Sequence, residues 1–131
     1  MHSLAAVFKA LSDETRLEML GLLLKEGELC VCDFVEVLGV TQSKASRHLR
    51  NLVNAGLLQD RREAVWVYFR IAEKPGPAQK AVLSGLRPFL SEQMPAGLSA
   101  ALEKWRRRKA RCEGICKPKP IQKPTTRGGR R

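Results

Sequence analysis

Residues 31–49 read Val-Cys-Asp-Phe-Val-Glu-Val-Leu-Gly-Val-Thr-Gln-Ser-Lys-Ala-Ser-Arg-His-Leu, and this stretch decides the fold of the chain. Gly39 follows an apolar segment and predicts the end of a helix over Val31–Leu38. Thr41 is a good N-cap for a second helix, Gln42–Ala55, and Gly56 stands just past its expected end. Two short helices joined by a glycine-containing turn indicate a helix-turn-helix.

Two further helices are expected upstream of this motif. Ser3 can cap a short helix over Leu4–Leu11, which has an apolar face. Ser12 is a second good N-cap, followed by acidic residues where the helix dipole favours them. That helix is expected to run to about Lys25, because Gly27 ends it.

A β-hairpin is expected directly downstream. The segments Leu57–Asp60 and Ala64–Ile71 read as two strands, and the second is rich in β-branched and aromatic residues. Between them Arg61-Arg62-Glu63 is expected to form the turn. A hairpin after a helix-turn-helix is a wing, so the predicted fold is mainly α with a small β-hairpin, a winged helix-turn-helix.

The C-terminal part is expected to be helical and then disordered. Ala78–Met94 reads as a helix that Pro88 kinks or divides, and Leu98–Arg111 as a last helix. Residues 104–131 carry 12 Lys and Arg and one acid, which accounts for the whole net charge of +11. We therefore divide the chain into residues 1–96, a domain for DNA binding and dimerisation, and residues 97–131, a basic helix with a disordered tail.

Cys30 and Cys32 are the candidate ion ligands. The sequence shows no secretory signal pattern and no apolar run that could span a bilayer, so a cytoplasmic protein with reduced thiols is expected. Thiolates favour soft ions and exclude Mg²⁺ and Ca²⁺. Helical residues two apart point about 200° away from each other, so sharing one ion would distort the first turn of the helix. The alternative is that both cysteines pack as small apolar side chains.

Basic and polar residues on the second helix of the motif are the candidate DNA contacts. Residues 42–70 carry six basic and two acidic side chains, a local excess that favours nucleic acid. These side chains can reach base edges or phosphates from the major groove, and wing-tip arginines suit phosphates or the minor groove. The alternative is a solvated cationic surface. The candidates are Gln42, Ser43, Lys44, Ser46, Arg47, His48 and Arg50, with Arg61 and Arg62 at the expected wing tip.

Cys112 and Cys116 are four residues apart, so on a helix they share a face and could bind one ion. Incidental thiols are the alternative. A structural zinc protein using all four cysteines is disfavoured, because 79 residues separate the two pairs and this spacing fits no common zinc ribbon. The chain also has no Ser/His/Asp set, no phosphate loop and only two histidines, so an enzyme is not expected.

Together these motifs resemble the ArsR family of metalloid-responsive repressors, over about residues 4–72. The resemblance rests on Asp13-Glu14-Thr15-Arg16-Leu17, Glu28-Leu29-Cys30-Val31-Cys32-Asp33, Ser43-Lys44-Ala45-Ser46-Arg47-His48-Leu49, Gly56-Leu57-Leu58 and Val65-Trp66-Val67-Tyr68. It implies a homodimer whose first and last helices form the interface. It also implies that Cys30 and Cys32 bind As(III) or Sb(III), and that binding releases double-stranded operator DNA.

Two departures from the family pattern bear on the ligand set. Some members place a third cysteine three residues after the second, where this chain has Val35. The zinc-sensing branch uses histidines on its C-terminal helix, and residues 78–94 contain none, so that site is excluded. The third sulfur that As(III) prefers is therefore unassigned: Cys112 or Cys116 could supply it, and two-sulfur binding completed by water or an external thiol is the alternative. A repressor responsive to Cd, Pb or Zn, and a thiol redox switch, remain alternatives that use the same cysteines.

Overall fold

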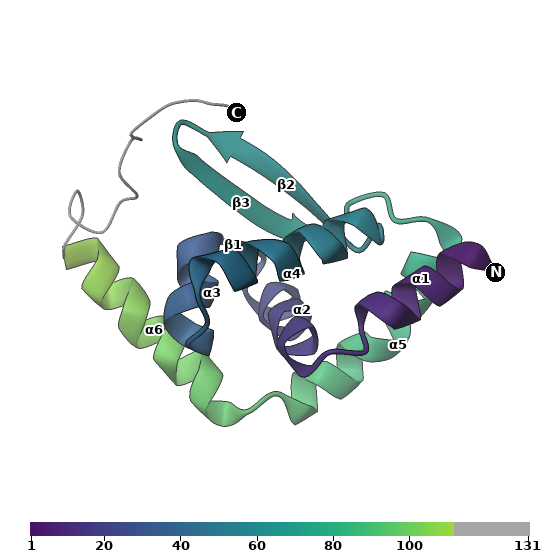
Figure 1. Ribbon diagram of the computed structural model, residues 1–131. Coiled ribbons are helices and arrows are strands. Elements are labelled where there is room, and N and C mark those ends of the chain that lie inside the picture. Colours follow the sequence, from purple (N-terminus) through teal and green to yellow (C-terminus); the bar gives the residue numbers. More distant parts are fainter. Residues whose placement is uncertain (112–131) are drawn as a thin grey trace.

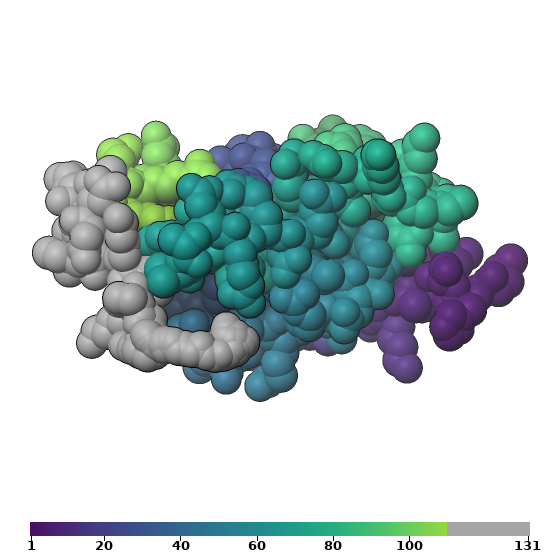
Figure 2. Space-filling view, turned by 90° about the horizontal axis from the view of Figure 1, so that it is seen from above, coloured from purple at the N-terminus to yellow at the C-terminus, as the bar shows by residue number. Residues whose placement is uncertain are grey.

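The computed structural model describes residues 1–111, which form six helices and three strands (Figure 1). The elements are α1 (His2–Ala10), α2 (Glu14–Glu26), β1 (Glu28–Cys30), α3 (Val31–Leu38), α4 (Gln42–Asn54), β2 (Leu58–Glu63), β3 (Trp66–Ile71), α5 (Pro77–Gln93) and α6 (Ala96–Arg111). Helices α1 and α5 pack together at one end of the molecule, and α6 packs on α3 at the other (Figures 1 and 2). Within the described residues, no helix is both long and apolar enough to cross a membrane.

One apolar core holds the helices and the sheet together. Its fully buried side chains come from α1, α2, β1, α3, α4 and α6, with Leu57 from the link before β2, and include Val7, Met19, Leu20, Leu22, Leu23, Leu29, Phe34, Leu49, Leu52, Leu57 and Leu102. Burial of this apolar surface is the main force that positions α3 against α4. The sequence forms one packed unit from α1 to α6 because each element contributes to this core.

The helix-turn-helix of α3 and α4 confirms the prediction from residues 31–49. Gly39 ends α3 with φ of 68°, a left-handed conformation that glycine adopts without steric cost. The Thr41 hydroxyl accepts a hydrogen bond of 3.1 Å from the backbone N–H of Lys44 and caps α4.

The expected caps of the first two helices were wrong by a few residues. Helix α1 begins at His2, so Ser3 lies inside it. Helix α2 is capped by Asp13, whose carboxylate accepts a 3.1 Å hydrogen bond from the backbone N–H of Arg16. The Ser12 hydroxyl instead donates to the carbonyl of Lys9 at 2.7 Å, because it helps to end the preceding helix.

The sheet has three strands where the sequence predicted a hairpin. The strands are antiparallel in the order β1-β3-β2, and the short strand β1 was not expected. The turn lies at Ala64 and Val65, and Ala64 has φ of 57°. Arg61 and Arg62 therefore lie within β2, paired with β3, and not at the tip. The pairing with β3 extends β2 by three residues beyond its expected end, since the alternation of side chains continues through the arginines.

The last two helices agree closely with expectation. Pro88 lies inside α5, and Pro77 occupies its first turn, where the missing N–H costs nothing. Helix α6 begins at Ala96, two residues before its expected start at Leu98, and packs against α3. The tail that was expected to be disordered, residues 112–131, lies outside the described residues.

Candidate functional site

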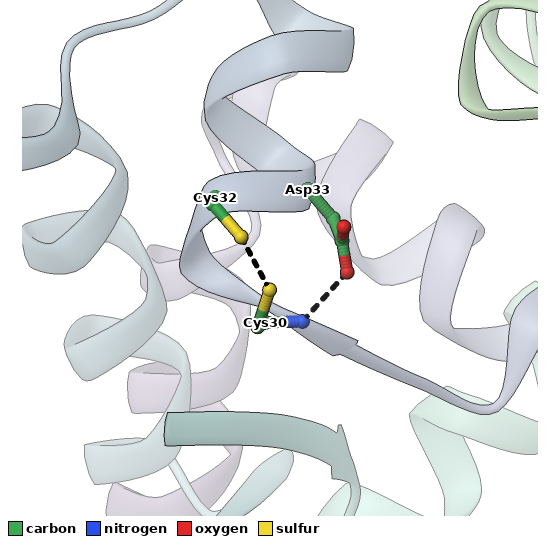
Figure 3. A group of neighbouring side chains, drawn as sticks. All are labelled: Cys30, Cys32 and Asp33. Carbon is green, nitrogen blue, oxygen red and sulfur yellow. Dashed lines mark hydrogen bonds between the residues drawn. The ribbon is translucent and has the colours of Figure 1, made fainter. Parts of the chain in front are cut away.

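Cys30 and Cys32 face each other at the start of α3 (Figure 3). Cys30 is both the last residue of β1 and the N-cap of α3, with φ of −96° and ψ of 169°. A thiol–thiol hydrogen bond joins the two Sγ atoms at 2.7 Å. The expectation that the helix must distort before the sulfurs can meet was wrong. Cys30 lies outside the helix in an extended conformation, so the helical angle between the two residues does not apply.

Asp33 fixes the backbone of this pair. Its Oδ2 accepts a 2.9 Å hydrogen bond from the N–H of Cys30, and the two residues form a capping box (Figure 3). The two sulfurs and a carboxylate oxygen of Asp33 lie within 4.8 Å of one another. The group thus has the spacing of a metal site, with sulfur from two residues and oxygen from a third.

Helix α6 covers the pair with a cation and an indole. The Lys109 ammonium donates to Asp33 Oδ1 at 3.0 Å and to Cys30 Sγ at 3.7 Å. The Trp105 indole N–H donates to the same Oδ1 at 2.8 Å. The carboxylate of Asp33 therefore accepts three hydrogen bonds and is largely engaged by the protein itself.

The contact between the two thiols shifts their pKa values in opposite directions. The hydrogen bond from Cys32 lowers the pKa of Cys30, with a smaller contribution from the charge of Lys109. The same hydrogen bond, with burial, raises the pKa of Cys32 far above its ordinary value. A thiolate at the N-terminus of α3 is also favoured by the helix dipole. Cys30 is therefore the more acidic of the two thiols.

The carboxyl group of Asp33 stays ionised beside the two thiols. Burial raises its pKa, but the hydrogen bonds from the Cys30 N–H, the Trp105 indole and the Lys109 ammonium outweigh burial and lower it. Burial likewise lowers the pKa of Lys109, and the charge of Asp33 outweighs that effect, so the pKa is raised. The ammonium therefore keeps its charge and partly neutralises the neighbouring carboxylate.

The basic run of α6 docks on acids, a role that sequence reasoning left open. Arg106 pairs with Glu26 of α2 at 2.9 Å, and Arg108 pairs with Glu36 of α3. The signal was present in the sequence, because residues 1–41 carry seven acidic and three basic side chains. Charge complementarity alone could not place the two segments side by side, since their contact is tertiary.

Helix α4 presents a row of polar and basic side chains to solvent. Its buried side is apolar, with Ala45, Leu49 and Leu52 fully inside. The opposite side carries most of the predicted DNA contacts, all exposed: Gln42, Ser43, Lys44, Ser46, Arg47 and Arg50. Arg50 also pairs with Asp60 at 2.9 Å.

His48 does not belong to this exposed row, contrary to expectation. Its side chain is buried, and its Nδ1 accepts a 2.9 Å hydrogen bond from Arg16 Nε. Burial lowers the pKa of His48, which favours the neutral ring. His48 packs α4 against α2 because a 3.6-residue period brings it beside Leu49 on the inner side.

Arg61 and Arg62 differ although they are neighbours on β2. Arg61 donates to both carboxylate oxygens of Glu28, at 2.7 and 2.9 Å, and to Glu63 at 2.6 Å. The hydrogen bond from Arg61 lowers the pKa of Glu28. Arg62 is exposed and forms no ion pair with any described residue.

The remaining predicted ligands, Cys112 and Cys116, lie outside the described residues. Val35, which stands where some ArsR proteins have a third cysteine, is partly buried and packs on the core. Among the described residues, Cys30 and Cys32 are therefore the only thiols.

Comparisons with known proteins point to a family of bacterial regulators. Residues 13–60 match the model of the family "Bacterial regulatory protein, arsR family". The chain is 46% identical over 80 residues to the arsenic resistance transcriptional regulator ArsR1 of Pseudomonas putida, covering 61% of this chain and 62% of that one. It is 50% identical over 66 residues to the arsenical resistance operon repressor of Escherichia coli, covering 50% and 56%. The chain thus spans less than two thirds of either relative.

A solved structure supports the fold. The homodimeric winged helix-turn-helix DNA-binding domain of a Mycobacterium bovis protein, described as "a possible ArsR-family transcriptional regulator", matches with a TM-score of 0.57 and 31% identity. The match covers 72% of this chain and 83% of that chain. Residues 13–60 hold the cysteine pair and the helix-turn-helix, and the wing follows them as in a winged helix-turn-helix. The chain belongs to the ArsR family of bacterial regulatory proteins.

Proposed function

We propose that this protein is a homodimeric repressor that leaves its operator DNA when Cys30 and Cys32 bind As(III) or Sb(III). The observation that carries the proposal is the contact between the two sulfurs at the start of α3, one helix before the exposed basic row of α4. The arsenic resistance regulators to which the chain is similar support the same assignment. No enzyme is implied, because the site binds an ion and transmits its presence to DNA.

The chemistry of the pair suits a trivalent metalloid. Arsenious acid, As(OH)₃, would form one bond to each sulfur while two hydroxyl groups leave as water. The two thiols supply the protons of these waters, and solvent supplies a proton in place of any thiol that is already ionised. Soft thiolate ligands favour such an ion over hard cations. The carboxylate of Asp33 accepts three hydrogen bonds, so it competes poorly as a ligand.

The DNA contacts are assigned to α4 and the wing. We place Gln42, Ser43, Lys44, Ser46, Arg47 and Arg50 at base edges and phosphates, and Arg62 at a phosphate. A single winged helix reads a short half-site. The dimer should therefore bind an inverted repeat with half-sites about one helical turn apart, or a multiple of it.

The reduced protein should bind operator DNA and release it on addition of arsenite. The coupling is expected to be about 1–3 kcal/mol, which corresponds to a loss of affinity of about 5- to 150-fold. Fluorescence anisotropy with labelled operator, with and without arsenite, measures this change. Parallel titrations with Cd²⁺, Pb²⁺ and Zn²⁺ rank the competing ions. A stronger response to one of these than to As(III) or Sb(III) would replace the assigned effector.

The sulfur contact also favours a second candidate, a thiol redox switch. A thiolate beside a second thiol can be oxidised by peroxide to a sulfenic acid and then close to a disulfide with loss of water. This function requires release of DNA by peroxide alone. The same anisotropy assay, with peroxide in place of arsenite, separates it from metalloid sensing.

A third sulfur is proposed to come from Cys112 or Cys116. Lys109, only three residues before Cys112 in the chain, already lies 3.7 Å from the sulfur of Cys30. Arsenic X-ray absorption should therefore report three sulfur neighbours in the wild type and two in a Cys112→Ser/Cys116→Ser variant. The samples are reduced with a phosphine so that no external thiol binds. An unchanged coordination number would leave Cys30 and Cys32 as the whole protein-derived site.

A further inference from the structure

The cysteine site and the wing belong to the same small sheet. Strand β1 ends in Cys30, which lies opposite Tyr68 of β3, and Tyr68 in turn lies opposite Arg61 of β2. One row of residues thus crosses all three strands, from the ion-binding sulfur to the wing. Side chains in such a row are neighbours and contact each other directly.

An ion pair between Arg61 of β2 and Glu28 of β1 links the two outer strands of the sheet. The Arg61 guanidinium lies over the Tyr68 ring, 4.6 Å from its centroid, and reaches Glu28 at the other end of β1. It donates to both oxygens of Glu28 at 2.7 and 2.9 Å. A bidentate pair fixes orientation as well as distance, and a single lysine or amide could not do so. Glu28 is therefore held to the wing although β2 and β1 are not adjacent strands.

We propose that the Glu28–Arg61 ion pair transmits the state of the cysteine pair to the wing, and that Arg61 is a positioning residue and not a DNA contact. This inference rests on the proposed function, because it concerns how ion binding weakens DNA binding. It differs from the direct route through α3 and α4, which pack on each other.

The length of β1 is the first argument. The strand has three residues, so Glu28 and Cys30 are about 7 Å apart along the backbone. A segment this short moves as one unit when the sulfur of Cys30 is drawn to an ion. Because Glu28 accepts hydrogen bonds from Arg61, a movement of β1 also displaces β2, the strand that carries Arg62.

The hydrogen bonds of Arg61 are the second argument. Its Nε and Nη2 donate to Glu28, and its Nη1 donates to Glu63. Each of the three nitrogens thus already has a carboxylate partner, so a DNA phosphate would have to displace two acids. The neighbouring Arg62 points to the other side of the strand and is exposed, and it can meet a phosphate without such competition.

The test compares Glu28→Gln with wild type in the full-length protein. The variant should bind arsenite with unchanged stoichiometry and should bind metalloid-free operator with unchanged affinity. The loss of operator affinity caused by arsenite should shrink to about a third of the wild-type factor or less. Glu73→Gln is the matched control, because it makes the same change in an exposed ion pair between Glu73, just past β3, and Arg70 within β3, at 3.3 Å. That control should respond as wild type does.

Arg61→Gln and the Glu28→Gln/Arg61→Gln double variant complete the test. If the two residues act as one pair, the double variant loses no more coupling than either single variant. If Arg61 instead contacts a phosphate, Arg61→Gln weakens metalloid-free binding and lowers the slope of log affinity against log salt concentration by about one. The factor by which arsenite weakens binding then stays at its wild-type value. That result overturns the inference, as does a wild-type arsenite factor in Glu28→Gln. A wild type that ignores arsenite overturns the proposed function as well.

Discussion

Replacing both Cys30 and Cys32 with serine should abolish the release of operator DNA by arsenite. The full coupling of about 1–3 kcal/mol should disappear, because a hydroxyl group is a hard ligand that does not replace a thiolate at As(III). The metalloid-free variant should still bind DNA with wild-type affinity. Serine is a preferred N-cap, so the start of α3 is expected to keep its structure.

The two single variants sharpen this prediction. Each leaves only one sulfur in place, so an ion can no longer be held between Cys30 and the first turn of α3. Cys30→Ser and Cys32→Ser should therefore each lose the response, and circular dichroism should show the wild-type helix content and melting temperature. Arsenite-induced release that survives in the double variant would place the sensing site elsewhere in the chain.

Removing the positive charges of α4 should have the largest effect on metalloid-free DNA binding. Lys44→Ala and Arg47→Ala are each expected to weaken operator binding by about 1–3 kcal/mol. Both side chains are exposed on the face opposite the core, so neither change should destabilise the fold. Arg47→Ala should also relax the preference for the operator over unrelated DNA if it reads a base edge.

Lys104→Ala is the control for charge alone. It removes one exposed positive charge from α6, which packs on α3. Operator affinity measured at several salt concentrations should fall for the α4 variants and stay near wild type for this control. Normal operator binding by Arg47→Ala would show that α4 is not the DNA-reading helix.

Local signals predicted the helix-turn-helix well, because the residues that end one helix and cap the next lie within the motif. Gly39 and Thr41 act on their own neighbours, and both have the predicted roles. Strand β1 could not be predicted in the same way. Three residues carry little pattern, and their partners in β3 lie about 40 positions later, so the strand exists only through a tertiary pairing.

The candidate site was predicted in part for the same reason. The sequence identified Cys30 and Cys32 as the thiols, but the contact between the sulfurs depends on the extended backbone of Cys30. Lys109 and Trp105 donate hydrogen bonds to Asp33 from more than 70 residues further along the chain, so local patterns could not predict these contacts. His48 was wrongly expected among the exposed DNA contacts, because its neighbours in sequence are polar or basic. Only the rotational setting of α4 against the core shows that it is buried.

The position of Cys30 has a consequence for how a sensor of the proposed kind can evolve. The residue ends a strand, caps a helix and supplies a sulfur, so most substitutions there would change folding together with ligand binding. Lys109 and Trp105 reach the site through their side chains, from a helix more than 70 residues further along the chain. Under the proposed function, substitutions of Lys109 or Trp105 would change the charge and hydrogen bonding beside the sulfurs and leave intact the strand end and the helix cap that Cys30 provides.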